Sequence, residues 1–237
     1  MVPARMGRTR HFPGFGSRLR PSPGRMLPMR SIGALFLTVL VLTLASCGGS
    51  KPPAPATPVP AVYRVRFETT RGTFVVEVTK AWAPEGAERF YRLVEKQFYD
   101  DTRFFRVVRN FVVQFGINGD PVVEARWRNM TMRDDPVTQS NKRGTVTFAM
   151  AGPNTRTTQL FVNLKDNTRL DAAGFAPFGQ VVEGMEATVD HLWDSYGDAP
   201  PRGSGPDQTF VETMGNAYLD SKFPHLDTIR HARIVKP

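Results

Sequence analysis

The residue types best suited to chemistry lie at positions 104–116, in the sequence FFRVVRNFVVQFG. Read as two adjacent strands, this stretch brings the guanidinium of Arg106, the ring of Phe111 and the amide of Gln114 within ten residues. A fixed guanidinium can donate hydrogen bonds to an acceptor that develops during a reaction, and more strongly where apolar rings exclude water. From these residues alone, a plain core hairpin with an exposed arginine is the simpler interpretation, and it stays open.

A second stretch, FAMAGPNTRTTQLFVN, occupies residues 148–163. Its Gly-Pro-Asn-Thr sequence at 152–155 predicts a turn. After the turn, Gln159 and Phe161 alternate with Leu160, so their side chains share one face of a strand. The stretch therefore offers a second amide and a second aromatic ring on a single face.

The usual metal, cofactor and covalent chemistries have no candidates in the sequence. His191, His225 and His231 lack the spacing of zinc ligands, and there is no glycine-rich phosphate loop or Gly-x-Ser-x-Gly elbow. The Asp-Asp-Pro sequence at 134–136 is better explained as a turn than as a metal site. We therefore expect neither a metal nor a cofactor.

Short strands and a few helices must position these residues. Apolar and polar residues alternate at 63–68 and again at 74–78, with a tight turn between them, which predicts a hairpin. Helical spacing predicts one helix at 84–97 and a second at 185–193. Further short apolar strands are expected at 104–108, 111–115, 145–150, 160–162, 178–182 and 228–235. This pattern predicts a mainly β protein, an antiparallel barrel capped by helices.

Both motif stretches resemble signatures of one family, the cyclophilin-type peptidyl-prolyl cis/trans isomerases. Residues 104–116 resemble its F-x-R-x-x-x-x-F-x-x-Q-x-G signature, and residues 149–161 resemble its A-x-A-G-P-N-T-x-x-x-Q-x-F segment. Leu170-Asp171 and Phe178-Gly179 follow at the family spacing. The resemblance implies a closed eight-stranded antiparallel barrel capped by two α-helices, within an isomerase domain at 62–237.

The same resemblance implies roles for ten residues. It assigns catalysis to Arg106, Phe111 and Gln114. It assigns the proline-ring pocket and the contacts to the peptide backbone to Val112, Ala149, Met150, Gln159, Phe161, Leu170 and Phe175. Four positions depart from the residues that many members carry, namely Phe105, Met150, Arg169 and Phe175.

The implied activity is isomerisation of X-Pro bonds in proline-containing peptides and unfolded exported proteins, by a monomer that assists their folding. A proline-directed peptide-binding chaperone with little catalysis is the main alternative, and the presence of Arg106 argues against it. An inert structural lipoprotein is a third interpretation, which the number of matched pocket residues disfavours.

The positive charge of the chain is confined to its N-terminal quarter. The formal net charge is +9, and residues 1–60 hold eight basic residues and no acidic one, which leaves +1 for the rest. A nucleic-acid-binding domain would carry its basic residues on the folded part. We therefore expect no nucleic-acid partner.

The N-terminus has the layout of an export signal. The apolar run IGALFLTVLVLTL at 32–44 is too short for a stable membrane span, since it covers roughly 20 Å of a ~30 Å hydrocarbon core. Basic residues precede it and small residues follow it, which predicts a signal peptide at 1–46. The true start is expected at Met26 or Met29, with a genuinely long leader as the alternative.

Leu44-Ala45-Ser46-Cys47 resembles a bacterial lipobox, in which the cysteine is acylated and becomes the new N-terminus. An incidental thiol is the alternative for Cys47. The Pro/Ala-rich segment that follows predicts an extended tether over 47–61. We therefore expect a lipid-anchored protein of the cell envelope, attached to the outer membrane and facing the periplasm because Gly48 is not an aspartate.

Overall fold

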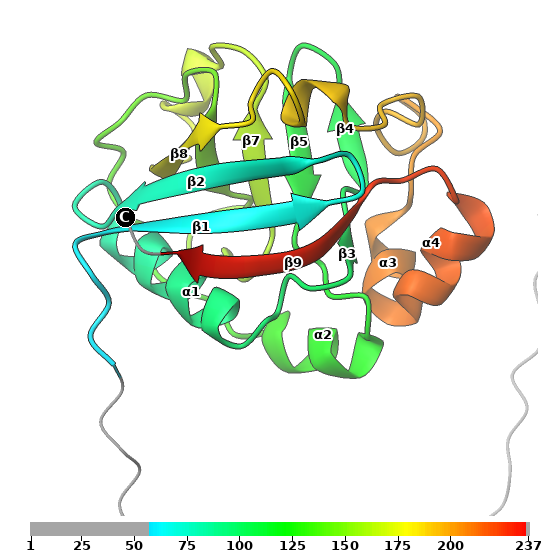
Figure 1. Ribbon diagram of the computed structural model, residues 1–237, viewed down its shortest axis with the longest axis horizontal. Helices are drawn as coiled ribbons and strands as arrows, with labels where there is room; N and C mark the ends of the chain where they lie inside the picture. Colours follow the sequence, from blue (N-terminus) through cyan, green and yellow to red (C-terminus); the bar gives the residue numbers. More distant parts are fainter. Residues whose placement is uncertain (1–56, 236–237) are drawn as a thin grey trace, which may run out of the picture. The chain divides into compact units, whose positions relative to one another are not determined.

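The computed structural model describes residues 57–235, which are built around one antiparallel sheet (Figure 1). Within this range nine strands follow one another in the order β3-β9-β1-β2-β8-β6-β7-β5-β4. The sheet curls around a core rich in aromatic rings. The strands are β1 Val62–Thr69, β2 Thr73–Thr79, β3 Thr102–Arg103, β4 Arg106–Val108, β5 Val112–Phe115, β6 Thr145–Phe148, β7 Leu160–Asn163, β8 Pro177–Glu183 and β9 Thr228–Val235.

The first hairpin contributes several aromatic rings to the main core. Tyr63, Val65 and Phe67 alternate with exposed or half-buried residues along β1, as the sequence predicts. Phe67 pairs with Phe74 of β2, and their stacked rings lie 4.7 Å apart between centroids. Burial of such rings removes large apolar areas from water and is the main favourable term in folding.

The strand predicted at 104–108 is confirmed in part, since only residues 106–108 form a strand, β4, and β3 lies just before the predicted range at 102–103. The mainly β antiparallel architecture is confirmed, with nine strands among the described residues where eight were expected. β3 and β4 stand at opposite ends of the strand order, and the chain passes between them through Phe104 and Phe105. Phe104 packs in the main core, whereas Phe105 packs in a second apolar cluster. Because each ring is held on a different side, the chain crosses from one sheet edge to the other and joins the two edges covalently.

The helix predicted at 84–97 is confirmed as α1, Pro84–Glu95. Pro84 lies in its first turn, where a missing N–H costs nothing. The helix ends before Gln97, whose φ of +56° lies in the left-handed region. Its apolar face packs against the core through Ala87, Phe90, Leu93 and Val94.

The acidic sequence at 134–136 is a buried helix cap rather than the predicted turn. The Asp135 carboxylate accepts hydrogen bonds from the backbone N–H groups of Glu85 and Gly86, at 2.9 Å each. It also pairs with the guanidinium of Arg156 at 3.0 Å. The carboxylate therefore satisfies two free N–H groups at the start of α1 and neutralises a buried cation.

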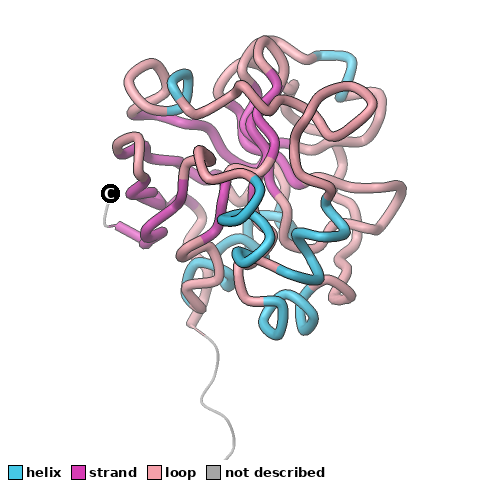
Figure 2. Tube along the Cα trace, turned by 90° about the vertical axis from the view of Figure 1, so that its right-hand side faces the viewer, coloured by secondary structure: helices cyan, strands magenta, loops and turns pink. Residues whose placement is uncertain are grey.

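The helix predicted at 185–193 is wrong, because this segment contains only a short 3-10 helix at Val189–His191. Three further α-helices were not predicted: α2 Pro121–Trp127, α3 Gln208–Met214 and α4 Asn216–Lys222. Seen from the side, these short helices alternate with long loops that form much of the surface (Figure 2).

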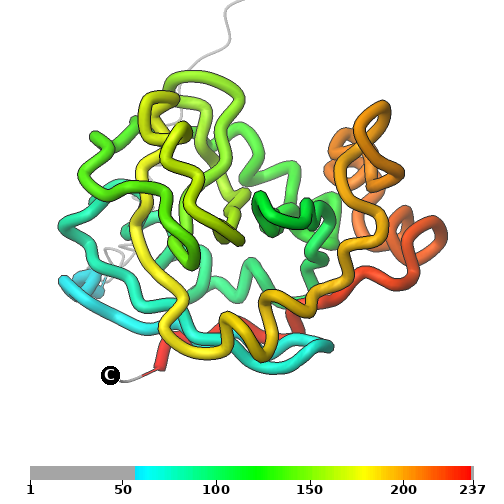
Figure 3. Tube along the Cα trace, turned by 90° about the horizontal axis from the view of Figure 1, so that it is seen from above, coloured from blue at the N-terminus to red at the C-terminus, as the bar shows by residue number. Residues whose placement is uncertain are grey.

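Helices α3 and α4 pack on a second apolar cluster and form a lobe at one side of the molecule (Figure 3). Val211 of α3 and Leu219 of α4 meet Phe105 in this cluster. Phe105 is 1% exposed, so the residue directly before Arg106 anchors the lobe to the sheet.

No helix within residues 57–235 is long and apolar enough to cross a membrane. The predicted signal peptide, Cys47 and most of the predicted tether lie outside the described residues.

Candidate active site

Three neighbouring strands bring the motif residues into one row. Arg106 of β4 pairs with Gln114 of β5, and Gln114 pairs with Phe161 of β7. The β4–β5 hairpin turns at Asn110, whose φ of +57° is one that asparagine tolerates well. The sheet register therefore places a guanidinium, an amide and a ring from two distant motifs side by side.

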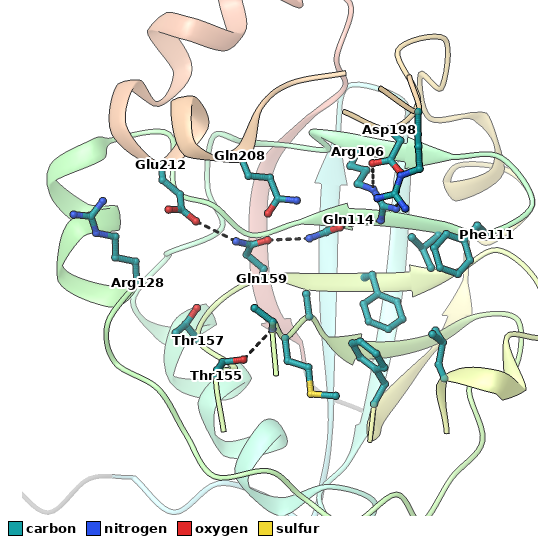
Figure 4. A pocket seen from close by; sticks show the side chains of 18 residues that line it. Arg106, Phe111, Gln114, Arg128, Thr155, Thr157, Gln159, Asp198, Gln208 and Glu212 are labelled. Atoms are coloured by element: carbon teal, nitrogen blue, oxygen red, sulfur yellow. Dashed lines mark hydrogen bonds and ion pairs between the residues drawn. The ribbon is translucent and has the colours of Figure 1, made fainter. Parts of the chain in front are cut away.

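All ten site residues predicted from the sequence line one cavity of about 520 Å³ (Figure 4). Its other lining residues are Arg128, Ala151, Thr155, Thr157, Asp198, Arg202, Gln208 and Glu212. The plain core hairpin with an exposed arginine is therefore wrong, because Arg106 lines this cavity and its side chain is only 17% exposed.

One part of the cavity is apolar. The rings of Phe161 and Phe175 meet edge to face, with centroids 5.6 Å apart. The ring of Phe111 has the guanidinium of Arg106 at 5.7 Å and that of Arg169 at 5.1 Å from its centroid. Both distances fall within the range of cation–π attraction, so the two cations hold this ring at the edge of the apolar part.

A continuous chain of hydrogen bonds crosses the cavity beside this apolar part (Figure 4). Arg106 Nη1 donates to Gln114 Oε1 at 3.1 Å, and Gln114 Nε2 donates to Gln159 Oε1 at 2.9 Å. Gln159 Nε2 then donates to Glu212 Oε1 at 3.4 Å. Each amide is thereby fixed in orientation, with oxygen toward one neighbour and nitrogen toward the other.

A close backbone contact keeps the two glutamines together. Gly116 follows β5 with a φ of +98°, and a Cβ atom there would lie 2.6 Å from the carbonyl oxygen of Thr158. The Thr158 hydroxyl donates to the Gly116 carbonyl at 2.8 Å. Only glycine fits this approach, which holds the residue before Gln159 against the end of β5.

Asp198 and Glu212 are two polar lining residues that sequence reasoning missed, one from the loop before α3 and one from α3 itself. Asp198 contacts Arg106 directly, with Oδ1 2.8 Å from Nε and Oδ2 3.2 Å from Nη2. Hydrogen bonds from Arg106 hold the pKa of Asp198 below its ordinary value. Glu212 lies at the other end of the row, where burial raises its pKa and the charge of Arg128 opposes that rise. No periodicity or local motif in the sequence marks these positions.

Within residues 57–235, no group of three or more histidine, cysteine, aspartate and glutamate side chains is placed to hold a metal ion. The cavity can bind an apolar ring beside a fixed row of hydrogen-bond donors and acceptors that begins at the guanidinium of Arg106.

Comparisons with known proteins agree with this arrangement. The family model for cyclophilin type peptidyl-prolyl cis-trans isomerases matches residues 64–203. A peptidyl-prolyl cis-trans isomerase of Acinetobacter baylyi is 33% identical over 133 residues, covering 54% of this chain and 70% of the relative. The peptidyl-prolyl cis-trans isomerase-like 1 protein of Gibberella zeae is 35% identical over 125 residues, covering 50% of this chain and 75% of its own length.

The fold has solved counterparts. The crystal structure of a cyclophilin type isomerase of Cryptosporidium parvum superposes with a TM-score of 0.55 at 19% identity, covering 74% of this chain and 99% of the other. The fold is thus of the cyclophilin type. The chain belongs to the cyclophilin-type peptidyl-prolyl cis/trans isomerases and is an enzyme of that family.

Proposed function

We propose that this isomerase acts on X-Pro bonds of exported proteins in the cell envelope, using the row that begins at Arg106. The observation that carries the proposal is the position of this guanidinium, which lines the cavity between the ring of Phe111 and the amide of Gln114. A cation at the edge of an apolar cavity can contact a proline nitrogen whose ring is held in that cavity.

The proline ring binds in the apolar part of the cavity. Phe111, Phe161 and Phe175 provide aromatic surface there, and Val112 and Leu170 complete it. With the ring held, the acyl side of the X-Pro bond is the part that rotates. Aromatic side chains offer large contact area at a small loss of conformational entropy, which suits them to this task.

Gln114 and Gln159 hold the peptide backbone, since an amide offers both a donor and an acceptor. Ala149 and Met150 lie where the chain leaves β6, and their main chain pairs with the substrate. Two anchors, one for the ring and one for the backbone, fix the axis about which the bond turns.

Arg106 stabilises the twisted state. Amide resonance gives the X-Pro bond a barrier near 18–20 kcal/mol, and rotation takes the nitrogen out of conjugation. Its lone pair then becomes an acceptor, so a fixed guanidinium binds the transition state better than either ground state, and no proton moves. A typical turnover of about 1–10³ s⁻¹ requires the barrier to fall by roughly 3–7 kcal/mol.

The test replaces Arg106 and a matched cation on the same hairpin. Arg106→Ala should keep the fold and lower kcat on a proline peptide about 10²- to 10³-fold, as removal of one transition-state donor does elsewhere. Arg109→Ala is the control, because the Arg109 side chain is 78% exposed and does not line the cavity. If Arg106→Ala turns over the peptide at the wild-type rate, the proposed mechanism is wrong.

The location in the envelope rests on the sequence of residues 1–61, with lipid attached at Cys47 and a monomeric domain held away from the outer membrane. The Cys47→Ser variant should lose the anchor and appear as a soluble or unprocessed protein in cell fractions. A processed variant that still pellets with membranes would contradict the lipid anchor.

A further inference from the structure

The loop at 194–207, between the last 3-10 helix and α3, delivers a carboxylate to the active-site arginine. Asp198 and Arg106 face each other with side chains only 14% and 17% exposed. Their contact is two-pronged, since Nε and Nη2 of the guanidinium meet the two carboxylate oxygens at 2.8 Å and 3.2 Å. Paired contacts of this kind fix geometry as well as charge.

The loop is itself held in place, so Asp198 is a fixed partner. Gly205 N donates to the Asp198 carbonyl at 2.8 Å, and Ser204 N donates to the Tyr196 carbonyl at 3.0 Å. The ring of Tyr196 packs edge to face on Phe223, with centroids 5.1 Å apart, in the second apolar cluster. The carboxylate is thus supported by the same lobe that packs on Phe105.

The contact leaves part of the arginine free for a substrate. A guanidinium has five N–H donors. Asp198 accepts from Nε and Nη2, and Gln114 accepts from Nη1. Two N–H donors remain, one on each terminal nitrogen. Because both edges of the planar group are held, its rotation is blocked and these two donors keep fixed directions.

The carboxylate does not cancel the local positive charge. Arg202 of the same loop contacts Asp198 Oδ2 through Nε at 3.1 Å. Two guanidinium groups thus share one carboxylate, and the three side chains together keep a net charge of +1. The arrangement orients Arg106 while a positive charge stays beside the apolar part of the cavity.

We infer that Asp198 is a positioning residue, which holds the guanidinium of Arg106 in the direction of the nitrogen of the rotating bond. The inference rests on the role proposed for Arg106. It also gives a function to the loop at 194–207, which supplies an active-site residue from outside both sequence motifs.

The experiment compares Asp198→Asn with Asp194→Asn in the full chain, using kinetics on a proline peptide. Asp194 is a matched control because it lies on the same loop and pairs with the exposed Arg109. We expect Asp198→Asn to lower kcat about 10- to 100-fold with KM changed less than about twofold, as small misplacements of a reacting group do. Asp194→Asn should match the wild type. Wild-type or faster turnover by Asp198→Asn would overturn the inference, and faster turnover would show that Asp198 restrains catalysis.

Two further measurements separate positioning from a loss of structure. In an Arg106→Ala background, Asp198→Asn should cause no further loss, whereas an additional loss of similar size would show that Asp198 acts independently of Arg106. The ¹⁵N–¹H signal of Arg106 Nε should shift and exchange faster in Asp198→Asn and stay unchanged in Asp194→Asn. An unchanged signal in both variants would also overturn the inference.

The outcomes distinguish this inference from the proposed function. If Arg106→Ala is impaired and Asp198→Asn is not, only the role of Asp198 is refuted. If Arg106→Ala itself keeps full activity, the mechanism and the role of Asp198 are refuted together.

Discussion

At the scale of single residues, the site depends on side chains that fix each other. Gln114 and Gln159 come from motifs 45 positions apart, yet their amides share a hydrogen bond of 2.9 Å. Each amide would otherwise rotate freely and present either oxygen or nitrogen to a peptide. The chain of hydrogen bonds removes that choice before a substrate arrives, which lowers the entropic cost of binding.

Gln159→Met tests the glutamine row with a side chain of similar length. It removes both hydrogen bonds of the amide and leaves the buried amide of Gln114 without that partner. Because we propose that the row holds the peptide backbone, we expect KM to rise about tenfold, the equivalent of one lost hydrogen bond, with a smaller change in kcat. An unchanged KM in steady-state assays would exclude this role.

The sequence predicted ten lining residues, eight of them in its two motifs, and missed those of the loop before α3 and of α3 itself. The eight motif residues lie on β4, β5 and β7 or in the connections that join β4 to β5 and β6 to β7, and their order and spacing carry the signal. Asp198 lies 92 residues from Arg106, in a loop with no periodic pattern. Such a contact depends on where α3 and α4 pack, and that packing depends on long-range burial around Phe105.

At the scale of elements, burial was easier to predict than backbone conformation. Met185, Val189 and Leu192 are buried, as helical spacing at 185–193 suggested. The segment nevertheless lacks an α-helix, because Thr188 turns to bond the Thr73 carbonyl through its hydroxyl at 3.0 Å. Side-chain hydrogen bonds of this kind compete with the helix, so tertiary contacts override the local pattern.

Two aspartates that cap helices, one buried and one at the surface, test how much burial increases the contribution of a cap to stability. Asp135 caps α1 and pairs with Arg156, and these side chains are 3% and 2% exposed. Asp120 caps α2 at the surface by accepting from Val122 N at 2.8 Å. We expect Asp135→Ala to lower the free energy of unfolding by about 3 kcal/mol, because α1 loses its cap and the buried Arg156 keeps only the Asp134 carboxylate, and Asp120→Ala by about 1 kcal/mol. Equal losses in urea unfolding would contradict this account.

Helix α2 also gives the fold a dependence on pH. Burial raises the pKa of Glu124 to about 7, although its carboxylate accepts from Asn118 N at 2.7 Å. From about pH 4.5 to 7, the folded chain holds a proton that the unfolded chain has released, so stability falls as pH rises through this window and then levels off.

Glu124→Gln should remove this dependence. The variant should be more stable than the wild type by up to about 3 kcal/mol at pH 8 and little changed at pH 4. Thermal unfolding of both proteins across this range measures the difference. A gain that is equal at both pH values would show that the proton on Glu124 is not its cause.

At the scale of the whole molecule, the described residues form one compact unit that includes the start of the chain leading into β1. Arg92 of α1 donates to the Thr57 carbonyl at 2.6 Å, and Val59 packs against the main core. These contacts favour a domain that includes the residues just before β1, so we expect it to begin before residue 62.

Two fragments test this boundary. A fragment of residues 57–237 should isomerise a proline peptide within about twofold of the mature protein and unfold at the same temperature. A fragment of residues 62–237 should unfold several degrees lower, because the loss of about 1 kcal/mol of contacts lowers the midpoint by that amount in a domain of this size. Identical midpoints of thermal unfolding for the two fragments would show that the domain begins at residue 62.

The neighbours of β1 determine when this protein can become active. Figure 1 shows β1 between β2 and β9, so the first strand of the sheet lies beside the last. Phe67 of β1 faces Ala232 of β9, and such distant pairings make folding slow. A growing chain presents its first strand long before it can present the ninth. The sheet therefore cannot be completed until the residues of β9 have been synthesised.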